Sequence, residues 1–186
     1  MLILASASSA RRGLLRRAGI RFRAVSPRVP ELRGRGRTLR ETVIENARRK
    51  AAAVPGERVL SADTMIAYGG RIYGKPASRK AAVDLLARLA GRTHVIATGI
   101  AYRNGGRTVT RCVETRVTLR ALDRGSIARL LASYDPTRFA GGYALSRSRR
   151  DPLIERIEGS LTNVMGLPME CVLPLARRSH ASSRGR

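Results

Sequence analysis

The chain has 186 residues, of which 43% are apolar and 27% charged, and its formal net charge is +24. This apolar content is sufficient for a buried core, which argues against disorder, and the length suits one large or two small domains. No apolar run approaches the ~20 residues that a membrane span requires, and the start Met1–Ala5 lacks the basic residues of a signal peptide. We therefore expect a cytoplasmic protein with no membrane segment.

The positive charge, taken alone, predicts a nucleic acid or another polyanion as partner. However, the basic residues are spread along the chain, aromatic residues make up only 4%, and we identify no nucleic-acid-binding motif. We expect nucleic-acid binding to be non-specific at most, and a basic nucleic-acid-binding protein is the alternative. Only three of the 37 basic residues are lysines, Lys50, Lys75 and Lys80. A compact ammonium in an arginine-rich chain suits a phosphate or metal-adjacent site, although chance explains so small a number equally well.

The start of the chain predicts a strand, a hydroxyl-rich turn and a helix. Leu2–Ala5 has the apolar character of a buried strand, Ser6–Ala10 is small and polar, and a helix begins with Arg11 and Arg12. Free N–H groups and the positive end of the helix dipole make this arrangement an anion site. In the alternative interpretation, Ser8 or Ser9 only caps the helix and the two arginines are solvated.

A carboxylate interrupts the most strand-like stretch of the chain, Arg58–Pro76. Asp63 lies there among β-branched and apolar residues, where unpaired burial of an acid is unfavourable by several kcal/mol, so we expect it to meet a cation, a metal or N–H donors. Gly69 and Gly70 predict a hairpin that brings Lys75 back toward Asp63. We interpret the pair as an acid and a lysine facing a phosphate site. Alternatively, Asp63 caps a turn and Lys75 is a surface charge.

The rest of the chain predicts further strands and helices. Strands are expected at 20–25, 93–102, 108–119 and 153–157, and helices at 38–53, 78–90, from 123 and from 166 to about 177. Glu31 lies in the loop before the helix at 38–53, and Lys50 lies near the end of that helix, where it also complements the helix dipole. His94 is expected to be structural. The pattern predicts a mixed α/β fold with β-hairpins, without strict βαβ alternation.

Six separated motifs occur together and in order. They are Leu4–Arg12 with Leu14-Leu15, Ser61–Thr64, Gly74–Pro76, Leu89–His94 with Thr98-Gly99, Ala140–Tyr143, and Asn163–Pro168. Together they closely resemble the Maf (septum-formation) family over nearly the whole chain. The resemblance implies a long mixed β-sheet with flanking helices and a deep cleft, similar in fold to inosine triphosphate pyrophosphatases. We expect one two-lobed domain at 1–177 and a flexible basic tail at 178–186, and the family also suggests a homodimer.

The resemblance implies a house-cleaning nucleoside triphosphate pyrophosphatase. In this family water attacks the α-phosphorus of a nucleoside triphosphate, giving the monophosphate and pyrophosphate with the help of a divalent cation. By the resemblance Asp63 is the general base, and Glu31 and Asp63 hold the cation, Mg²⁺ or alternatively Mn²⁺. The implied substrate-binding residues are Ser6, Ser8, Arg11, Arg12, Lys50 and Lys75.

Several positions bear on which base the site accepts. Ala10 stands where one branch of the family carries arginine and the methylguanosine-triphosphate branch carries tryptophan, whereas Thr64 fits the thymidine/uridine triphosphate branch. Ser146 stands where that branch has glutamine, and Pro30 replaces the acid that usually precedes Glu31. We expect dTTP, UTP or modified pyrimidine triphosphates as substrates, and a methylated guanosine triphosphate is the alternative.

Overall fold

The computed structural model describes residues 1–34, 36–145 and 151–181, with side chains up to residue 176. The elements follow one another as β1 (Leu2–Ala5), α1 (Ser9–Arg17), β2 (Phe22–Val25), α2 (Leu39–Ala52), β3 (Arg58–Tyr68), β4 (Arg71–Tyr73), α3 (Arg79–Leu89), β5 (Thr93–Asn104), β6 (Arg107–Leu119), α4 (Arg124–Ala132), η1 (Pro136–Arg138), η2 (Ala140–Gly142), β7 (Ile154–Glu158), α5 (Leu161–Val164) and α6 (Met169–Ala181). None of the described helices is long and apolar enough to span a membrane.

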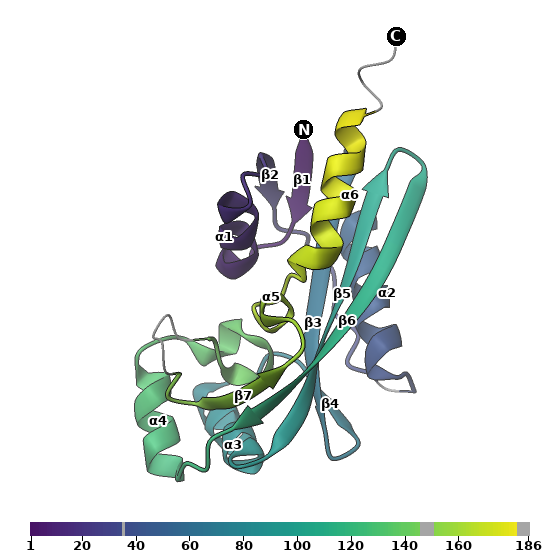
Figure 1. Cartoon of the computed structure of the whole chain (residues 1–186). Coiled ribbons are helices and arrows are strands. Elements are labelled where there is room, and N and C mark those ends of the chain that lie inside the picture. Colours follow the sequence, from purple (N-terminus) through teal and green to yellow (C-terminus); the bar gives the residue numbers. More distant parts are fainter. Residues whose placement is uncertain (35, 146–150, 182–186) are drawn as a thin grey trace.

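The described strands form one mixed sheet of seven. Its order is β2-β1-β3-β5-β6-β7, and β4 pairs with β3 outside this path. β1 is parallel to β2 and β3, whereas the other neighbours are antiparallel. Strands β3, β5 and β6 form the long twisted centre, with helices on both faces (Figure 1). This architecture confirms the expected mixed α/β fold with a long sheet and flanking helices.

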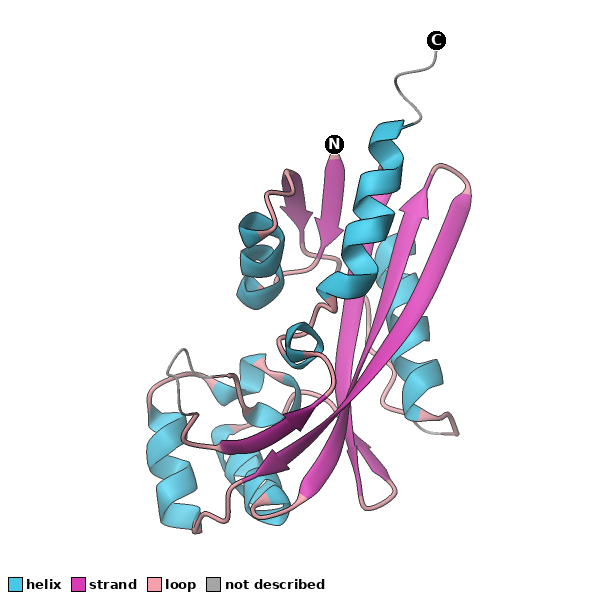
Figure 2. Cartoon of the chain, viewed as in Figure 1, coloured by secondary structure: helices cyan, strands magenta, loops and turns pink. Residues whose placement is uncertain are grey.

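Alternation along β1 separates two layers of helices. Leu2 and Leu4 pack with residues of α1 and α6, whereas Ile3 and Ala5 pack with α2. Because successive side chains of a strand point to opposite faces, α2 covers one face of the sheet, and α1 and α6 cover the other. Figure 2 shows α1 and α6 at the end of the molecule near the N-terminus, with the helices of the other lobe below them.

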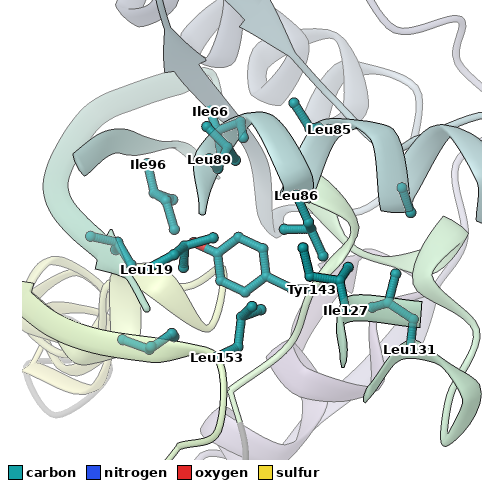
Figure 3. Packing of buried hydrophobic residues seen from close by; sticks show 13 residues of the cluster. Ile66, Leu85, Leu86, Leu89, Ile96, Leu119, Ile127, Leu131, Tyr143 and Leu153 are labelled. Atoms are coloured by element: carbon teal, nitrogen blue, oxygen red, sulfur yellow. The ribbon is translucent and has the colours of Figure 1, made fainter. Parts of the chain in front are cut away.

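A second apolar core lies at the far end of the sheet, between the strands, α3 and α4. The ring of Tyr143 lies among Ile96, Leu86, Leu119 and Leu153 (Figure 3). Its hydroxyl oxygen is 2.7 Å from Nε2 of His94, and the two rings meet edge to face. Burial lowers the pKa of His94 to about 4, so the imidazole is neutral at pH 7. These contacts fasten the loop around η2 to the sheet.

Most helices and strands lie where local sequence patterns predicted them. The Thr38 side chain accepts from the Glu41 N–H while the Glu41 carboxylate accepts from the Thr38 N–H, and this capping box begins α2 where the helix at 38–53 was predicted. Gly69 and Gly70 both have positive φ, 56° and 71°, as a two-residue hairpin turn requires. Strands β5 and β6 extend beyond the predicted ends at residues 102 and 108, because Asn104 still pairs with Arg107 and residues 105–106 form the turn.

The C-terminal part differs more from the sequence-based expectation. Residues Leu161–Val164 form the short helix α5, where no helix was predicted, since Ser160 caps it through the Asn163 N–H. The last helix begins at Met169, directly after Pro168, and continues to Ala181 instead of ending near residue 177. The expected tail at 178–186 is therefore helical at its start, and residues 182–186 lie outside the described part.

Candidate active site

Asp63 lies at a gap in the sheet. β1 is short and pairs with β3 only at residues 59–61, whereas β4 pairs with β3 at residues 66–68. Within the described residues no strand covers residues 62–65 on this edge of β3, although β5 pairs with them on the other edge. Asp63 and Thr64 lie in this gap, and a cavity of about 420 Å³ opens beside them.

One lysine joins the two acids expected at the site. The Lys50 ammonium lies 2.5 Å from Oδ1 of Asp63 and 2.6 Å from Oε1 of Glu31. The Asp63 side chain is 4% exposed and that of Lys50 11%, whereas the Glu31 side chain is 39% exposed. Removing one partner of a buried ion pair is unfavourable by about 3–5 kcal/mol, so Lys50 and Asp63 depend on each other. Glu31 extends the pair toward solvent.

Cations around the cavity act on Glu31. Partial burial by itself raises the pKa of this carboxyl, but the charge and hydrogen bond of Lys50, with smaller contributions from Lys75 and Arg11, bring the pKa below its ordinary value. Glu31 is therefore ionised at neutral pH. Lys75, which follows the β3–β4 hairpin, lines the same cavity as Glu31 and Asp63, as the sequence predicted.

Arg11 binds backbone and side-chain oxygens on three sides of the cavity. Its Nε donates to the carbonyl of Gly166 (2.7 Å), and its Nη1 donates to the carbonyl of Ala62 (2.9 Å) and to Oγ of Ser6 (3.1 Å). Its Nη2 donates to Oγ1 of Thr64 (3.0 Å). A guanidinium has five N–H groups, so only one of them is left for a ligand. Arg11 thus connects α1, β3 and the turn before α6.

The serine turn before α1 both caps the helix and lines the cavity, so it combines the two roles that the sequence suggested. Oγ of Ser8 accepts from the Arg11 N–H at 3.3 Å and caps α1, as in the simpler interpretation. Oγ of Ser6 is buried and accepts from the Ser8 N–H at 3.2 Å. Both serines nevertheless line the cavity. The turn is therefore held rigidly at the cavity wall.

The cavity brings most of the predicted site residues together. Its walls include Ser6, Ser8, Ala10, Arg11, Glu31, Lys50, Asp63, Thr64 and Lys75. Arg12 is not among the wall residues, because neighbouring side chains on a helix point about 100° apart and Arg11 is the one that faces β3. Ser146 lies outside the described residues.

One wall of the cavity was not predicted from the sequence. The segment around η1 and η2 contributes Thr137, Arg138, Phe139, Ala140, Tyr143, Ala144 and Leu145. The motif Ala140–Tyr143 was recognisable in the sequence, but its distance of about 80 residues from Asp63 gave no local sign that it faces the acids. Asn46 was also not predicted as a site residue, and its Nδ2 donates to Oδ2 of Asp63 at 2.9 Å.

The acids fit a small divalent cation. Among the described residues there is no group of three or more His, Cys, Asp or Glu side chains that could hold a metal ion. Mg²⁺, however, is usually bound by one or two carboxylates together with substrate phosphates and water. Glu31 and Asp63 are two hard oxygen donors brought together by Lys50, so they suit Mg²⁺ or Mn²⁺ when a polyphosphate completes the ligand set.

Comparisons with known proteins identify the family of the chain. The chain is 39% identical over 183 residues to a dTTP/UTP pyrophosphatase of Myxococcus xanthus, covering 96% of this chain and 92% of the relative. It is 38% identical over 174 residues to a dTTP/UTP pyrophosphatase of Pelotomaculum thermopropionicum (90% and 91%), and 37% identical over 180 residues to a nucleoside triphosphate pyrophosphatase of Xylella fastidiosa (91% and 94%). The family model described as Maf-like protein matches residues 1–179, and the chain therefore belongs to the Maf-like protein family.

Proposed function

We propose that the protein hydrolyses nucleoside triphosphates to nucleoside monophosphates and pyrophosphate. The observation that carries the proposal is the convergence, in one cavity of about 420 Å³, of the Glu31–Lys50–Asp63 network with Arg11 and Lys75. Cavities of this size accept small molecules, and the mixture of acids and cations suits a metal-bound polyphosphate. Relatives that cover nearly the whole chain have the same activity in their names.

In the proposed reaction the protein mainly positions groups and stabilises charge. Asp63 accepts a proton from the attacking water at a carboxylate oxygen as the water oxygen forms a bond to the α-phosphorus. The bond from that phosphorus to the bridging oxygen breaks, and pyrophosphate leaves with the electron pair. Lys75 and the free N–H of Arg11 neutralise negative charge on the phosphates, and Lys50 holds both acids in place.

The proposal includes a divalent cation held by Glu31 and Asp63, most simply Mg²⁺ and alternatively Mn²⁺. When bound, such an ion neutralises phosphate charge and lowers the pKa of a coordinated water. The two acids have different environments, since Asp63 is buried and bonded at both oxygens whereas Glu31 is partly exposed. Glu31 is therefore the acid that meets an entering ion first.

We propose pyrimidine triphosphates, dTTP and UTP or their modified forms, as substrates. Two relatives of high similarity are named dTTP/UTP pyrophosphatases, which favours this base class. Ala10 and Thr64 both line the cavity, but the Thr64 hydroxyl is bonded to Arg11 and lies 2.9 Å from Oγ1 of Thr98. We therefore assign Thr64 an indirect part in base choice, through the position of Arg11, and Ala10 a direct one at the wall.

The test is a pyrophosphate-release assay with Mg²⁺ over a panel of natural, modified and methylated triphosphates. We expect release with dTTP and UTP and loss of activity when the cation is chelated. In ¹⁸O-labelled water the label should enter the monophosphate, because water attacks the α-phosphorus. Formation of orthophosphate and diphosphate, or no product from any triphosphate with folded protein, refutes the proposal.

The net charge of +24 supports a second candidate, a basic nucleic-acid-binding protein with an inactive cleft. It predicts tight binding to duplex or single-stranded nucleic acid that persists at physiological salt. Binding that disappears at that salt concentration reduces the interaction to non-specific attraction. We also propose that the enzyme acts in the cytoplasm. By family resemblance we propose a homodimer, and light scattering during size-exclusion chromatography tests this oligomeric state.

A further inference from the structure

Asn46 is a buried amide whose hydrogen bonds all lead to the two acidic segments of the site. It lies on α2, it is 2% exposed, and its Nδ2 donates to Oδ2 of Asp63 at 2.9 Å. The same nitrogen donates to the carbonyl of Leu32 at 3.1 Å, and Oδ1 accepts from the Leu32 N–H at 2.8 Å. One side chain therefore binds the strand that carries Asp63 and the loop residue next to Glu31.

The Leu32 N–H fixes which way the amide is turned. Because this N–H can only donate, it requires the carbonyl oxygen of Asn46 on its side. The NH₂ group then faces two acceptors, the Leu32 carbonyl and the Asp63 carboxylate, and uses one hydrogen for each. A reversed amide would set its oxygen against both acceptors. Asn46 is thus only a donor toward Asp63, and the Leu32 N–H in the loop fixes the orientation of its amide group.

Asn46 and Lys50 act on Asp63 from the same face of α2. Residues four apart on a helix are neighbours, and these two bind the two different carboxylate oxygens, Lys50 at Oδ1 and Asn46 at Oδ2. A carboxylate held at both oxygens has a fixed plane. The lone pairs that stay free are then directed toward the cavity that Asp63 lines.

We propose that Asn46 is a positioning residue for the reaction, which orients the Asp63 carboxylate and holds the Glu31 segment against it. This inference rests on the proposed function. It assigns Asn46 no contact with the substrate, since Asn46 is not part of the cavity wall. Partners that orient a ligating or catalytic carboxylate typically change activity about 10–100-fold when they are removed.

The principal variant is Asn46→Leu, which keeps the size of the side chain and removes its three hydrogen bonds. With Mg²⁺ and the best triphosphate of the panel, we expect kcat to fall about 10–100-fold and KM to change less than about threefold, because positioning acts in the transition state. In an Asp63→Asn background, the same change should lower kcat by less than about threefold, since residues that act as a unit are not additive. A full multiplicative loss in that background overturns the proposal.

Ser61→Ala is the matched control. Ser61 is buried on β3, two residues before Asp63, and its hydroxyl donates to the carbonyl of Ala47 on α2 at 2.6 Å. It fastens the same helix to the same strand without touching either acid. We expect its kcat to stay within about threefold of the wild type. An equal loss in Ser61→Ala and Asn46→Leu would mean that any link between α2 and β3 matters, and would overturn the proposal.

A second variant separates the hydrogen bond that Asn46 accepts from Leu32 from the one that it donates to Asp63, and it covers the case in which Asn46→Leu does not fold. At a pH where it is ionised, Asn46→Asp keeps an acceptor for the Leu32 N–H but has no hydrogen to donate to Asp63. We expect slow hydrogen exchange at the Leu32 amide in the wild type and in Asn46→Asp, and a kcat reduced about 10–100-fold in Asn46→Asp. Wild-type kcat in Asn46→Asp overturns the proposal.

The wild type measured in parallel separates this inference from the proposed function. An inactive wild type refutes the proposed function, and exchange at the Leu32 amide then still decides whether Asn46 holds the loop. Fast exchange in the wild type, as fast as in Asn46→Leu, overturns the proposal without any assay of activity. An active wild type with an equally active, folded Asn46→Leu overturns the inference alone.

Discussion

Gly99 controls how closely α2 approaches the site. It is the pairing partner of Asp63 in the antiparallel β3–β5 ladder, so a side chain at Gly99 would point to the face that α2 covers. A Cβ at this position would lie 2.6 Å from the backbone nitrogen of Ile44 and closer still to the Val43 carbonyl. These are backbone atoms of α2 and cannot rotate away. Gly99→Ala therefore has to displace the helix.

The size of the displacement follows from ordinary contact distances. Non-bonded heavy atoms approach to about 3.5 Å, so α2 must move by about 1 Å relative to β5. Asn46 lies less than one turn beyond Ile44, and a shift of this size would lengthen its 2.9 Å bond to Asp63 beyond hydrogen-bond range. Overpacking of this kind destabilises by about 1–3 kcal/mol, and misplacement by ~1 Å can lower turnover about 100-fold.

Two measurements test Gly99→Ala. We expect the thermal midpoint to fall by about 2–4 °C for each kcal/mol lost, and kcat measured well below the midpoint to fall about 10–100-fold. Gly106→Ala is the control and should behave as wild type, since Gly106 lies in the turn after β5 and its added methyl group would meet no atom of the described residues within 4 Å. Wild-type kcat and midpoint in Gly99→Ala would show that the close approach of α2 does not hold the site together.

Three further substitutions test separate parts of the site and core. Asp63→Asn should lower kcat about 100-fold or more and also lower the midpoint, because the buried Lys50 ammonium loses one of its two acids and the new NH₂ group faces the NH₂ of Asn46; wild-type turnover would make Asp63 structural. Arg11→Lys should lower the midpoint and kcat together, since an ammonium cannot reach four acceptors on three segments; an unchanged midpoint in thermal melts contradicts the clamp. His94 has its pKa lowered from 6.5 to about 4 by burial, so the unfolded state binds more protons and stability falls as pH drops from 6.5 to 4. The slope is at most about 1.4 kcal/mol per pH unit, and His94→Gln should flatten it in urea titrations; an unchanged slope assigns the effect elsewhere.

Local chemistry explains which parts of the fold were predictable. The capping box of α2, the two glycines of the β3–β4 turn and the acid inside β3 each act over a few residues, so the sequence alone indicates them. The short helix α5 was missed because four residues show no apolar periodicity, and its cap resembles an ordinary turn. The prediction that residues 31, 50, 63 and 75 share one site rested more on the family resemblance than on the periodicity of the sequence.

The parts of the site that were missed depend on contacts between distant segments. Asn46 is an ordinary polar residue on an amphipathic helix until β3 and the 31–32 loop are placed against it, 17 and 14 residues away. Arg138 and Phe139 line the cavity because contacts with distant parts of the chain hold their segment in place, among them the packing of Tyr143 in the far core and the hydrogen bond from the Gly141 N–H to the Gly74 carbonyl. The sequence alone also does not indicate which of two adjacent arginines, Arg11 or Arg12, faces the cavity.

The gap in the sheet explains why Arg11 belongs to the fold as well as to the site. A strand edge left uncovered inside a cavity carries backbone groups that need partners, and an unsatisfied buried carbonyl is destabilising. The Ala62 carbonyl, at the start of the gap, accepts from Nη1 of Arg11, and the neighbouring Thr64 hydroxyl accepts from Nη2. The guanidinium therefore stands where a neighbouring strand would supply donors. The same opening places Asp63 at the cavity wall, so Arg11 stabilises the uncovered edge next to the acid that a ligand would meet.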